Sequence, residues 1–194
     1  MIDYLTHYYK KDTAPFQTLS ALTRSEALKV MNELADDSPI YSRFNNPNEY
    51  LDNRSRVEEW LINSFIRKGC EPTDRYPNYT VLGTSKWIEE HSINYRCDLC
   101  KIELPVSLFS EHDISFTVPD SMVTYNLEIQ QPANLYNPEF HGQVFTLTEA
   151  KTIFNKDFMA DVEKTKFPGG AIPYVEAQVW NHNLLKDYYR KLSE

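Results

Sequence analysis

A glutamate interrupts an otherwise apolar strand near the C-terminal end of the chain. Residues 174–180 alternate as a half-buried strand does, which places Glu176 and Gln178 on the same face. A charge in such a strand costs stability unless it is paired or used. Two carboxyl groups that meet at a substrate supply the acid and the base of a hydrolase. Glu176 together with Asp120 or Glu149 is therefore a candidate acid–base pair for nucleotide or sugar hydrolysis.

Residue types that suit a nucleotide site also occur in the N-terminal part of the chain. His7 lies in the aromatic, strand-like stretch 5–9, and Arg54 and Arg56 fall in a helical region. A histidine can hold ribose hydroxyls, an arginine pairs with a diphosphate, and an aromatic ring stacks on a departing base. With Glu176, these residue types make up the polar part of a nucleotide site if the fold brings them together.

This combination resembles the ADP-ribosyltransferases, in particular the nucleic-acid-modifying toxins of that fold. Those proteins carry His beside an aromatic on a first strand, Arg in an early helix or loop, and a catalytic Glu on a late strand. Segment 115–122 is similar to a middle strand and turn of that group, and segment 142–146 to the strand whose aromatic stacks on nicotinamide. The resemblance implies two sets of site residues: catalytic Glu176, His7 and Arg54, and cofactor-binding Tyr8, Phe145 and Ser121.

The resemblance also implies a reaction and a cofactor. Cleavage of the nicotinamide–ribose bond passes through an oxocarbenium-like state, and a carboxylate near the ribose stabilises the developing positive charge. We therefore expect an ADP-ribosyltransferase-like enzyme that uses NAD. The alternative is a non-catalytic interaction or adaptor protein that presents an aromatic surface to a protein partner. The chain also resembles members of an uncharacterised bacterial family, and that likeness implies no activity.

The three cysteines, Cys70, Cys97 and Cys100, include a single CxxC pair. A structural zinc site commonly takes two such pairs, and the sequence has no second one. We therefore expect neither zinc nor another metal, and we place Cys97 and Cys100 on opposite faces of a strand. An odd set of three is also unlike the disulfide framework of a secreted protein.

Composition and missing motifs exclude several classes of function. Lys and Arg number 20 against 28 Asp and Glu, for a net charge of −8, so broad binding to nucleic acid or to anionic lipid is not expected. A small nucleotide or a protein partner remains compatible with this charge. The sequence contains neither a P-loop nor a GxGxxG motif, which excludes the standard backbone cradles for phosphate. Without a signal-peptide pattern or a long apolar run, we expect a cytoplasmic protein.

The elements that must position these residues follow from local patterns. A capping box at 23–26 starts one helix, and Asn46-Pro47 starts a second over 48–68. Strand-like runs follow at 79–82, 93–104, 114–118, 122–129 and 143–147. A helix start at 148–150, a loop at 167–170, the strand 174–180 and a helix capped by Asn181 complete the chain. We predict one domain over 1–194 of α+β class, a helical N-terminal third packed on a mostly antiparallel sheet, with a C-terminal strand and helix.

Overall fold

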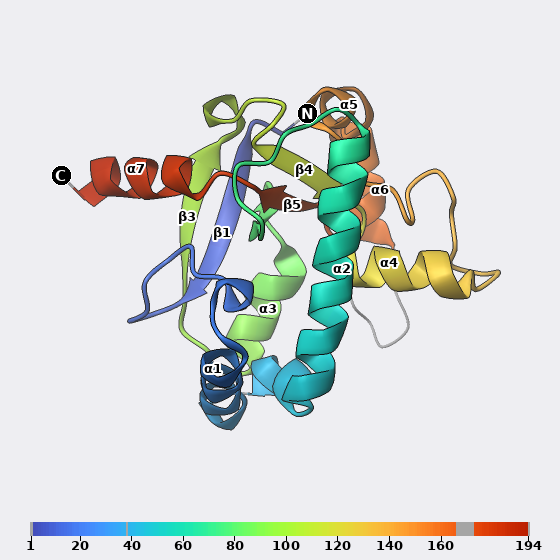
Figure 1. Ribbon diagram of the computed structural model, residues 1–194. Coiled ribbons are helices and arrows are strands. Elements are labelled where there is room, and N and C mark those ends of the chain that lie inside the picture. The colour runs from blue at the N-terminus through green and yellow to red at the C-terminus, as the bar shows by residue number, and fades with distance from the viewer. Residues whose placement is uncertain (1, 38, 166–172, 194) are drawn as a thin grey trace.

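The computed structural model describes residues 2–37, 39–165 and 173–193, and these ranges contain a five-stranded antiparallel sheet. Every described pairing between its strands is antiparallel. The strands lie in the order β3 (Leu99–Pro105), β1 (Tyr4–Lys10), β2 (Asn78–Leu82), β5 (Glu176–Val179) and β4 (Ile114–Thr117) (Figure 1). Helices and this sheet together confirm the predicted α+β class.

Helices occupy both flanks of the sheet and the N-terminal region. They are α1 (Arg24–Asp37), α2 (Pro47–Arg67), α3 (Lys86–Asn94), α4 (Ser121–Gln130), α5 (Leu147–Ile153), α6 (Lys156–Lys164) and α7 (His182–Ser193). Short 3-10 turns are η1 (Leu19–Ala21), η2 (Pro39–Phe44) and η3 (Val106–Leu108). The predicted capping box is present, since Glu26 accepts from the Thr23 backbone and Thr23 Oγ1 accepts from the Glu26 backbone. The predicted helix 48–68 corresponds to α2.

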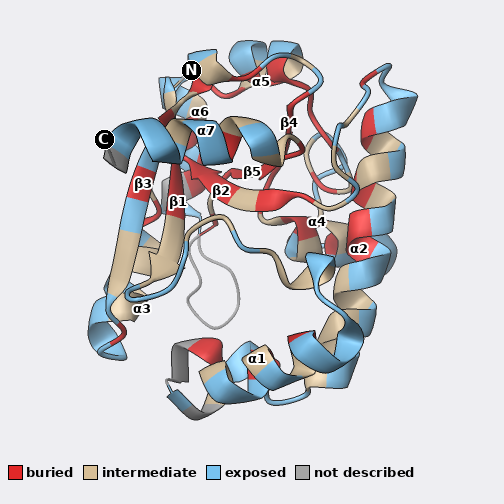
Figure 2. Cartoon of the chain, turned by 60° about the vertical axis from the view of Figure 1, so that its left-hand side comes forward, coloured by how far each residue is buried: buried red, intermediate tan, exposed pale blue. Residues whose placement is uncertain are grey.

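One face of the sheet is apolar and packs in the larger core. Side chains that share a face alternate along each strand and meet across paired strands. The register therefore groups Leu5, Leu82, Ala177 and Phe116 on this face, and all four are fully buried. Helices α5, α6 and α7 contribute to the same cluster, for example through Leu185. Figure 2 shows the buried residues concentrated in the strands, while the helices are exposed on their outer sides.

The opposite face of the sheet is covered by α2, which runs across it in Figure 1. Val57, Leu61 and Phe65 of α2 form a second cluster with Trp180 at the end of β5. A third cluster joins α1 and η2 to the start of β3, and includes Met31. Between these two apolar clusters the sheet face carries mainly polar side chains.

Three predicted strands differ from the structure. Segment 122–129 is helix α4, because Asp120 caps it by accepting from the Val123 backbone and the helix packs beside α2. Segment 93–104 combines the end of α3 with β3, and segment 143–147 reduces to an isolated bridge between Phe145 and Phe116 before α5 begins. The predicted loop 167–170 lies outside the described residues. Among the residues described, no helix is long and apolar enough to cross a membrane.

Candidate functional site

A row of mainly polar side chains lies on the sheet face beneath α2. The register places Thr6, Val81, Glu176 and Thr117 side by side across four strands. Their alternating neighbours on the same face are Tyr8, Tyr79, Gln178 and Ser115. A sheet face that packs under a helix is usually apolar, so this buried polar row is the part of the fold that packing alone does not explain.

Glu176 is the central residue of this row. Its side chain is buried, with 8% of the residue exposed. Oε1 accepts hydrogen bonds from the Ser121 backbone and from Gln178 Nε2, both at 3.0 Å. Burial raises the pKa of Glu176 to about 7, the charge of Asp120 acts in the same direction, and the hydrogen bonds from Ser121 and Gln178 oppose them. The carboxyl group therefore exchanges its proton near neutral pH.

Asp120 brings a second carboxyl group to the same place. It is half-buried at the N-terminus of α4, where Oδ1 accepts from the Val123 backbone at 3.0 Å. Burial raises its pKa, whereas the helix amides and the charge of Arg43 lower it. Ser121, the next residue, donates to Glu176, and the charge of Asp120 raises the pKa of Glu176, so the two carboxyl groups lie near each other at the start of α4. Glu176 and Asp120 are the pair of carboxyl groups that the hydrolase hypothesis considers.

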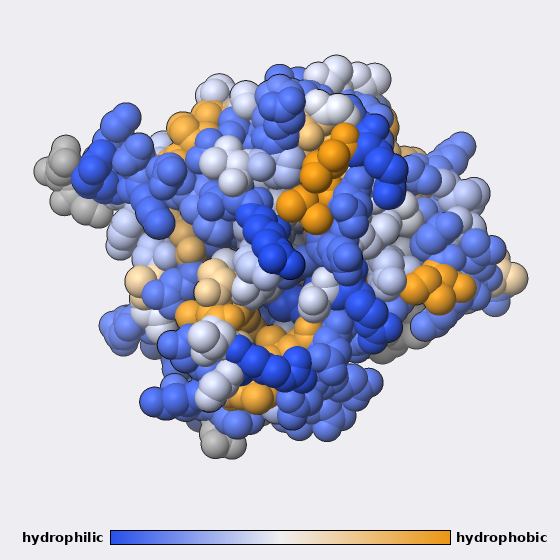
Figure 3. Space-filling view, in the orientation of Figure 1, coloured by the Kyte–Doolittle hydropathy of each residue, from blue (hydrophilic) through white to orange (hydrophobic). Residues whose placement is uncertain are grey.

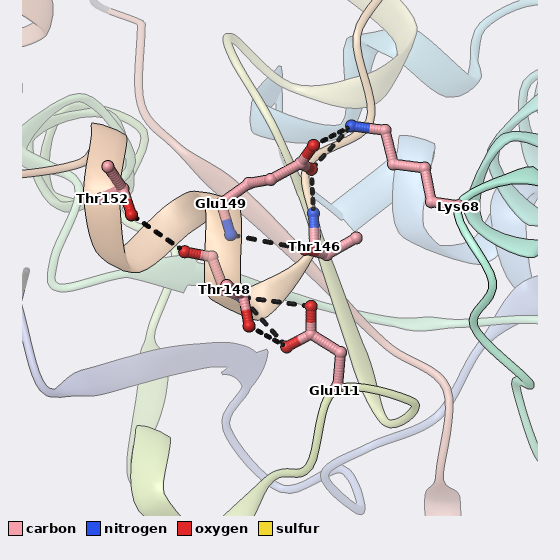
Figure 4. Close-up of polar contacts among 6 residues, drawn as sticks. All are labelled: Lys68, Glu111, Thr146, Thr148, Glu149 and Thr152. Carbon is pink, nitrogen blue, oxygen red and sulfur yellow. Dashed lines mark hydrogen bonds and ion pairs between the residues drawn. The ribbon is translucent and has the colours of Figure 1, made fainter.

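Glu149 has structural partners of its own. It forms a capping box with Thr146 at the start of α5, and both its carboxylate oxygens accept from Lys68 Nζ (Figure 4). Glu111 accepts hydrogen bonds from the backbone and the hydroxyl of Thr148, the residue before Glu149 on that helix. Glu149 thus stabilises a helix terminus, and Asp120 is the carboxylate that the fold places beside Glu176.

Arg54 lies on the same side of the sheet as Glu176, within a buried polar network. Its Nε lies 3.0 Å from Glu58 Oε1 and donates to Ser20 Oγ at 2.7 Å. Its guanidinium also stacks 4.7 Å from the ring centre of Tyr79, whose hydroxyl donates to Glu58. Burial raises the pKa of Tyr79, and the charges of Glu58 and Glu176 act in the same direction.

Arg56 has no such placement. Its side chain is exposed and binds the backbone of Asp52 and the side chain of Asn53 on the same helix. Of the two arginines considered from the sequence, Arg54 is therefore the one beside the polar row.

His7 does not join this group, which corrects the expectation that it lines a cleft with Glu176. It points to the apolar face of the sheet, and β2 separates its strand from β5. Nδ1 donates to the Tyr79 carbonyl at 3.1 Å, and Nε2 accepts from the Phe16 backbone at 2.9 Å. Burial lowers the pKa of His7 to about 4. Both ring nitrogens are occupied, so His7 orders the N-terminal segment.

The three residues expected to bind a cofactor lie in different surroundings. The hydroxyl of Tyr8 donates to Glu89 and accepts from the Ser85 backbone. Phe145 is buried in the core at 5.3 Å from the ring centre of Phe154, so its ring has no free face for nicotinamide. Of these three residues only Ser121 contacts Glu176, through its backbone N–H and its side chain.

Two further residues interact electrostatically with the carboxyl pair and were absent from the sequence-based site. Tyr174 is half-buried, and burial together with the charges of Asp120 and Glu176 raises its pKa. Arg43 is exposed, and its charge acts on both Asp120 and Tyr174. Alternation along 174–178 indicates the position of Tyr174, whereas no local pattern indicates that of Arg43.

The cysteines are placed differently from the prediction. Cys97 precedes β3, is buried, and lies with Sγ 3.6 Å from the hydroxyl of Tyr41. Cys100 is on β3, so the two residues do not occupy opposite faces of one strand. Within the described ranges, no group of three or more His, Cys, Asp or Glu side chains could hold a metal ion.

The adaptor hypothesis concerns exposed apolar surface rather than the polar row. Exposed large apolar residues of the described ranges are distributed over several elements: Leu22, Ile66, Ile93, Tyr95, Val123, Ile129, Tyr189 and Leu192. Figure 3 shows apolar residues on one face as separate patches among hydrophilic ones. The adaptor alternative stays a prediction.

Comparisons with known proteins return no match of any kind. No family model matches the chain, and no curated protein or solved structure is significantly similar to it. The resemblances to ADP-ribosyltransferases and to a bacterial family stay predictions.

Proposed function

We propose that the protein is an enzyme that cleaves a glycosidic bond of a nucleotide or sugar, with Glu176 and Asp120 as its carboxyl pair. ADP-ribosyl transfer from NAD is the first reaction of this class to test. The observation that carries the proposal is the environment of Glu176, a buried carboxyl group with a pKa of about 7 beside a second carboxyl group. Paired carboxyl groups held in different environments divide the roles of acid and base in such reactions.

The two groups take different parts in the proposed reaction. Burial raises the pKa of Asp120, and the amides of the α4 N-terminus and the charge of Arg43 oppose this shift by favouring the ionised form. An ionised Asp120 stabilises the oxocarbenium-like state as the glycosidic bond breaks. In NAD the leaving atom is the nicotinamide ring nitrogen, which departs neutral without a proton, so ionised Glu176 accepts the proton of the attacking water or acceptor hydroxyl. With an O-glycoside, protonated Glu176 gives its proton to the leaving oxygen. The bond from the anomeric carbon to the leaving group is replaced by a bond from the anomeric carbon to the oxygen of the attacking water or acceptor hydroxyl.

The cationic and aromatic surroundings support a substrate that carries phosphate. Arg43 is exposed beside Asp120 and Tyr174, and its guanidinium lies 4.9 Å from the ring centre of Phe44. An arginine held in this way pairs with phosphate oxygens, and a half-buried tyrosine packs against a sugar or base. A local cation of this kind also fits a chain whose overall charge disfavours broad nucleic-acid binding.

The test is a substrate survey with matched variants. NAD, adenosine, ADP-ribose and a nucleoside diphosphate sugar are each incubated with wild-type protein, and released base or sugar is measured by mass spectrometry. Glu176→Gln is expected to lower the rate by about 10²–10⁴-fold, the usual contribution of general acid–base catalysis. Glu149→Gln is the control, because it removes a carboxylate that caps a helix outside the pair. No release by wild-type protein, or equal release by Glu176→Gln, would contradict the proposal.

A further inference from the structure

A chain of buried hydrogen bonds leads to Glu176 from the interior of the sheet. Trp180 Nε1 donates to Ser115 Oγ at 2.9 Å, and Ser115 Oγ donates to Gln178 Oε1 at 2.8 Å. Gln178 Nε2 then donates to Glu176 Oε1 and to Thr117 Oγ1, both at 3.0 Å. Gln178, Ser115 and Trp180 are fully buried, so water does not compete for these bonds.

The direction of this chain follows from the chemistry of its members. An indole N–H can only donate, so Ser115 Oγ accepts from Trp180 and turns its single proton toward Gln178. The Gln178 carbonyl oxygen is then occupied, which leaves its amide N–H groups to face Glu176 and Thr117. In this orientation each polar atom of the Gln178 amide has a partner.

The two oxygens of Glu176 are therefore unequal. Oε1 receives N–H groups from two sides, Ser121 and Gln178. An oxygen that already accepts two N–H groups is a poor place for a proton, because the O–H would then face a donor. We propose that Gln178, oriented by Ser115 and Trp180, is the positioning residue that confines the exchangeable proton of Glu176 to Oε2.

This inference rests on the acid–base role proposed for Glu176 and states which atom performs it. Gln178 acts through Glu176 and is not assigned contact with substrate. The other groups that bear on the carboxyl are Asp120 at the start of α4, Tyr79 on β2 and Tyr174 before β5, with Arg43 acting through Asp120 and Tyr174. These groups are the same in wild type and in a Gln178 variant, so a change at Gln178 isolates the amide.

The experiment follows the Glu176 carboxyl directly by ¹³C NMR on protein labelled at glutamate, titrated over pH. The Glu176 resonance is identified by its absence in Glu176→Gln. Gln178→Met removes the donor to Oε1 while keeping the side-chain length. A hydrogen bond to a charged group favours the ionised form, so the pKa of Glu176 is expected to rise by about one to two pH units in this variant.

Thr80→Val is the matched control. Thr80 of β2 is also buried and donates to the carbonyl of Ala177, which lies on β5 as Gln178 does, but the Thr80 side chain is on the opposite face of the sheet. It is expected to lower stability without moving the titration of Glu176. If Gln178→Met does not fold, Ser115→Ala replaces it, since loss of the Ser115 hydroxyl frees the Gln178 amide to rotate. A smaller rise in the pKa is expected there.

An unchanged titration of Glu176 in a folded Gln178→Met or Ser115→Ala protein overturns the positioning role, as does an equal change in Thr80→Val. The titration needs no substrate, so it is independent of the proposed reaction. If the protein cleaves no glycosidic bond, the proposed function is contradicted. If the pKa of Glu176 nevertheless rises in Gln178→Met, the role of Gln178 in positioning the proton is still supported. Where activity is found, the limb of its pH profile that reports Glu176 moves with the titration.

Discussion

Replacement of Glu176 by Gln is expected to make the protein more stable at neutral pH and to change how stability depends on pH. The folded protein holds the pKa of this carboxyl at about 7, against an ordinary value of 4.5. Folding therefore favours the protonated form, so the contribution of Glu176 to stability is complete below pH 4.5 and is lost as pH rises to about 7. The difference in pKa between the folded and the unfolded state makes this loss in the free energy of unfolding about 3 kcal/mol. Gln is neutral at every pH and keeps an oxygen that can accept from Ser121 and Gln178.

His7 acts in the opposite direction over nearly the same range. Burial lowers its pKa from 6.5 to about 4, so folding favours the neutral ring and stability is lost as pH falls through this window. As pH falls from about 8 to about 5, protonation of His7 lowers the free energy of unfolding by about 2 kcal/mol. Protonation of Glu176 raises it by about 2 to 3 kcal/mol over the same range. These two contributions nearly cancel in the wild-type protein. The Glu176→Gln variant removes one of them and leaves the acid sensitivity of His7.

The assay is urea unfolding followed by tryptophan fluorescence, for both proteins, at about pH 5 and about pH 8. The stability of Glu176→Gln relative to wild type should increase by about 2 to 3 kcal/mol from the lower to the higher pH. In melting temperature this corresponds to roughly 4–12 °C for a chain of this size. A difference between the two proteins that is the same at both pH values would refute the buried, proton-binding state of Glu176.

Three further changes test separate parts of the structure. Asp120→Asn keeps an N-cap on α4 but removes the like charge, so the pKa of Glu176 should fall toward 4.5 in an NMR titration; a constant pKa would mean that Asp120 does not act on Glu176. His7→Phe should lose about 1–3 kcal/mol with its two hydrogen bonds, and its stability relative to wild type should rise as pH falls from 6.5 to about 4, as measured by urea unfolding; a difference that does not change with pH would contradict the buried, neutral state of His7. Leu61→Ala should cost about 2–5 kcal/mol in the same assay, because Leu61 is fully buried between α2 and the sheet, and a cost near zero would contradict that packing.

Elements with strong local signals were predictable from the sequence. Helix α2 carries a regular apolar stripe, a proline at its start and Gly69 after its end, and each of these is a short-range feature. Helix α4 was predicted as a strand because its Val, Thr, Tyr and Ile residues favour strands in isolation. The Asp120 cap and packing beside α2 override that preference. Such tertiary contacts cannot be read from a local pattern.

The site was only partly predictable for a similar reason. Alternation along β5 identifies Glu176 as a charge in a buried strand, and this is a local feature. Which carboxylate meets it depends on where α4 begins relative to β5, so Asp120 and Glu149 were equivalent in the sequence. The aromatic stretch around His7 predicts a strand but not the neighbour of that strand or the face that His7 occupies. Both depend on strand order across the sheet.

The most direct test of the central claim is the pH dependence of glycosidic-bond cleavage by wild-type protein and by Glu176→Gln, measured as release of the base from NAD or from whichever substrate the survey identifies. If Glu176 is catalytic, its pKa of about 7 produces an inflection near pH 7 in the pH profile of the wild-type rate. The Glu176→Gln variant loses this inflection together with most of the rate. A variant that retains the wild-type rate and the same pH profile would contradict the acid–base role of Glu176.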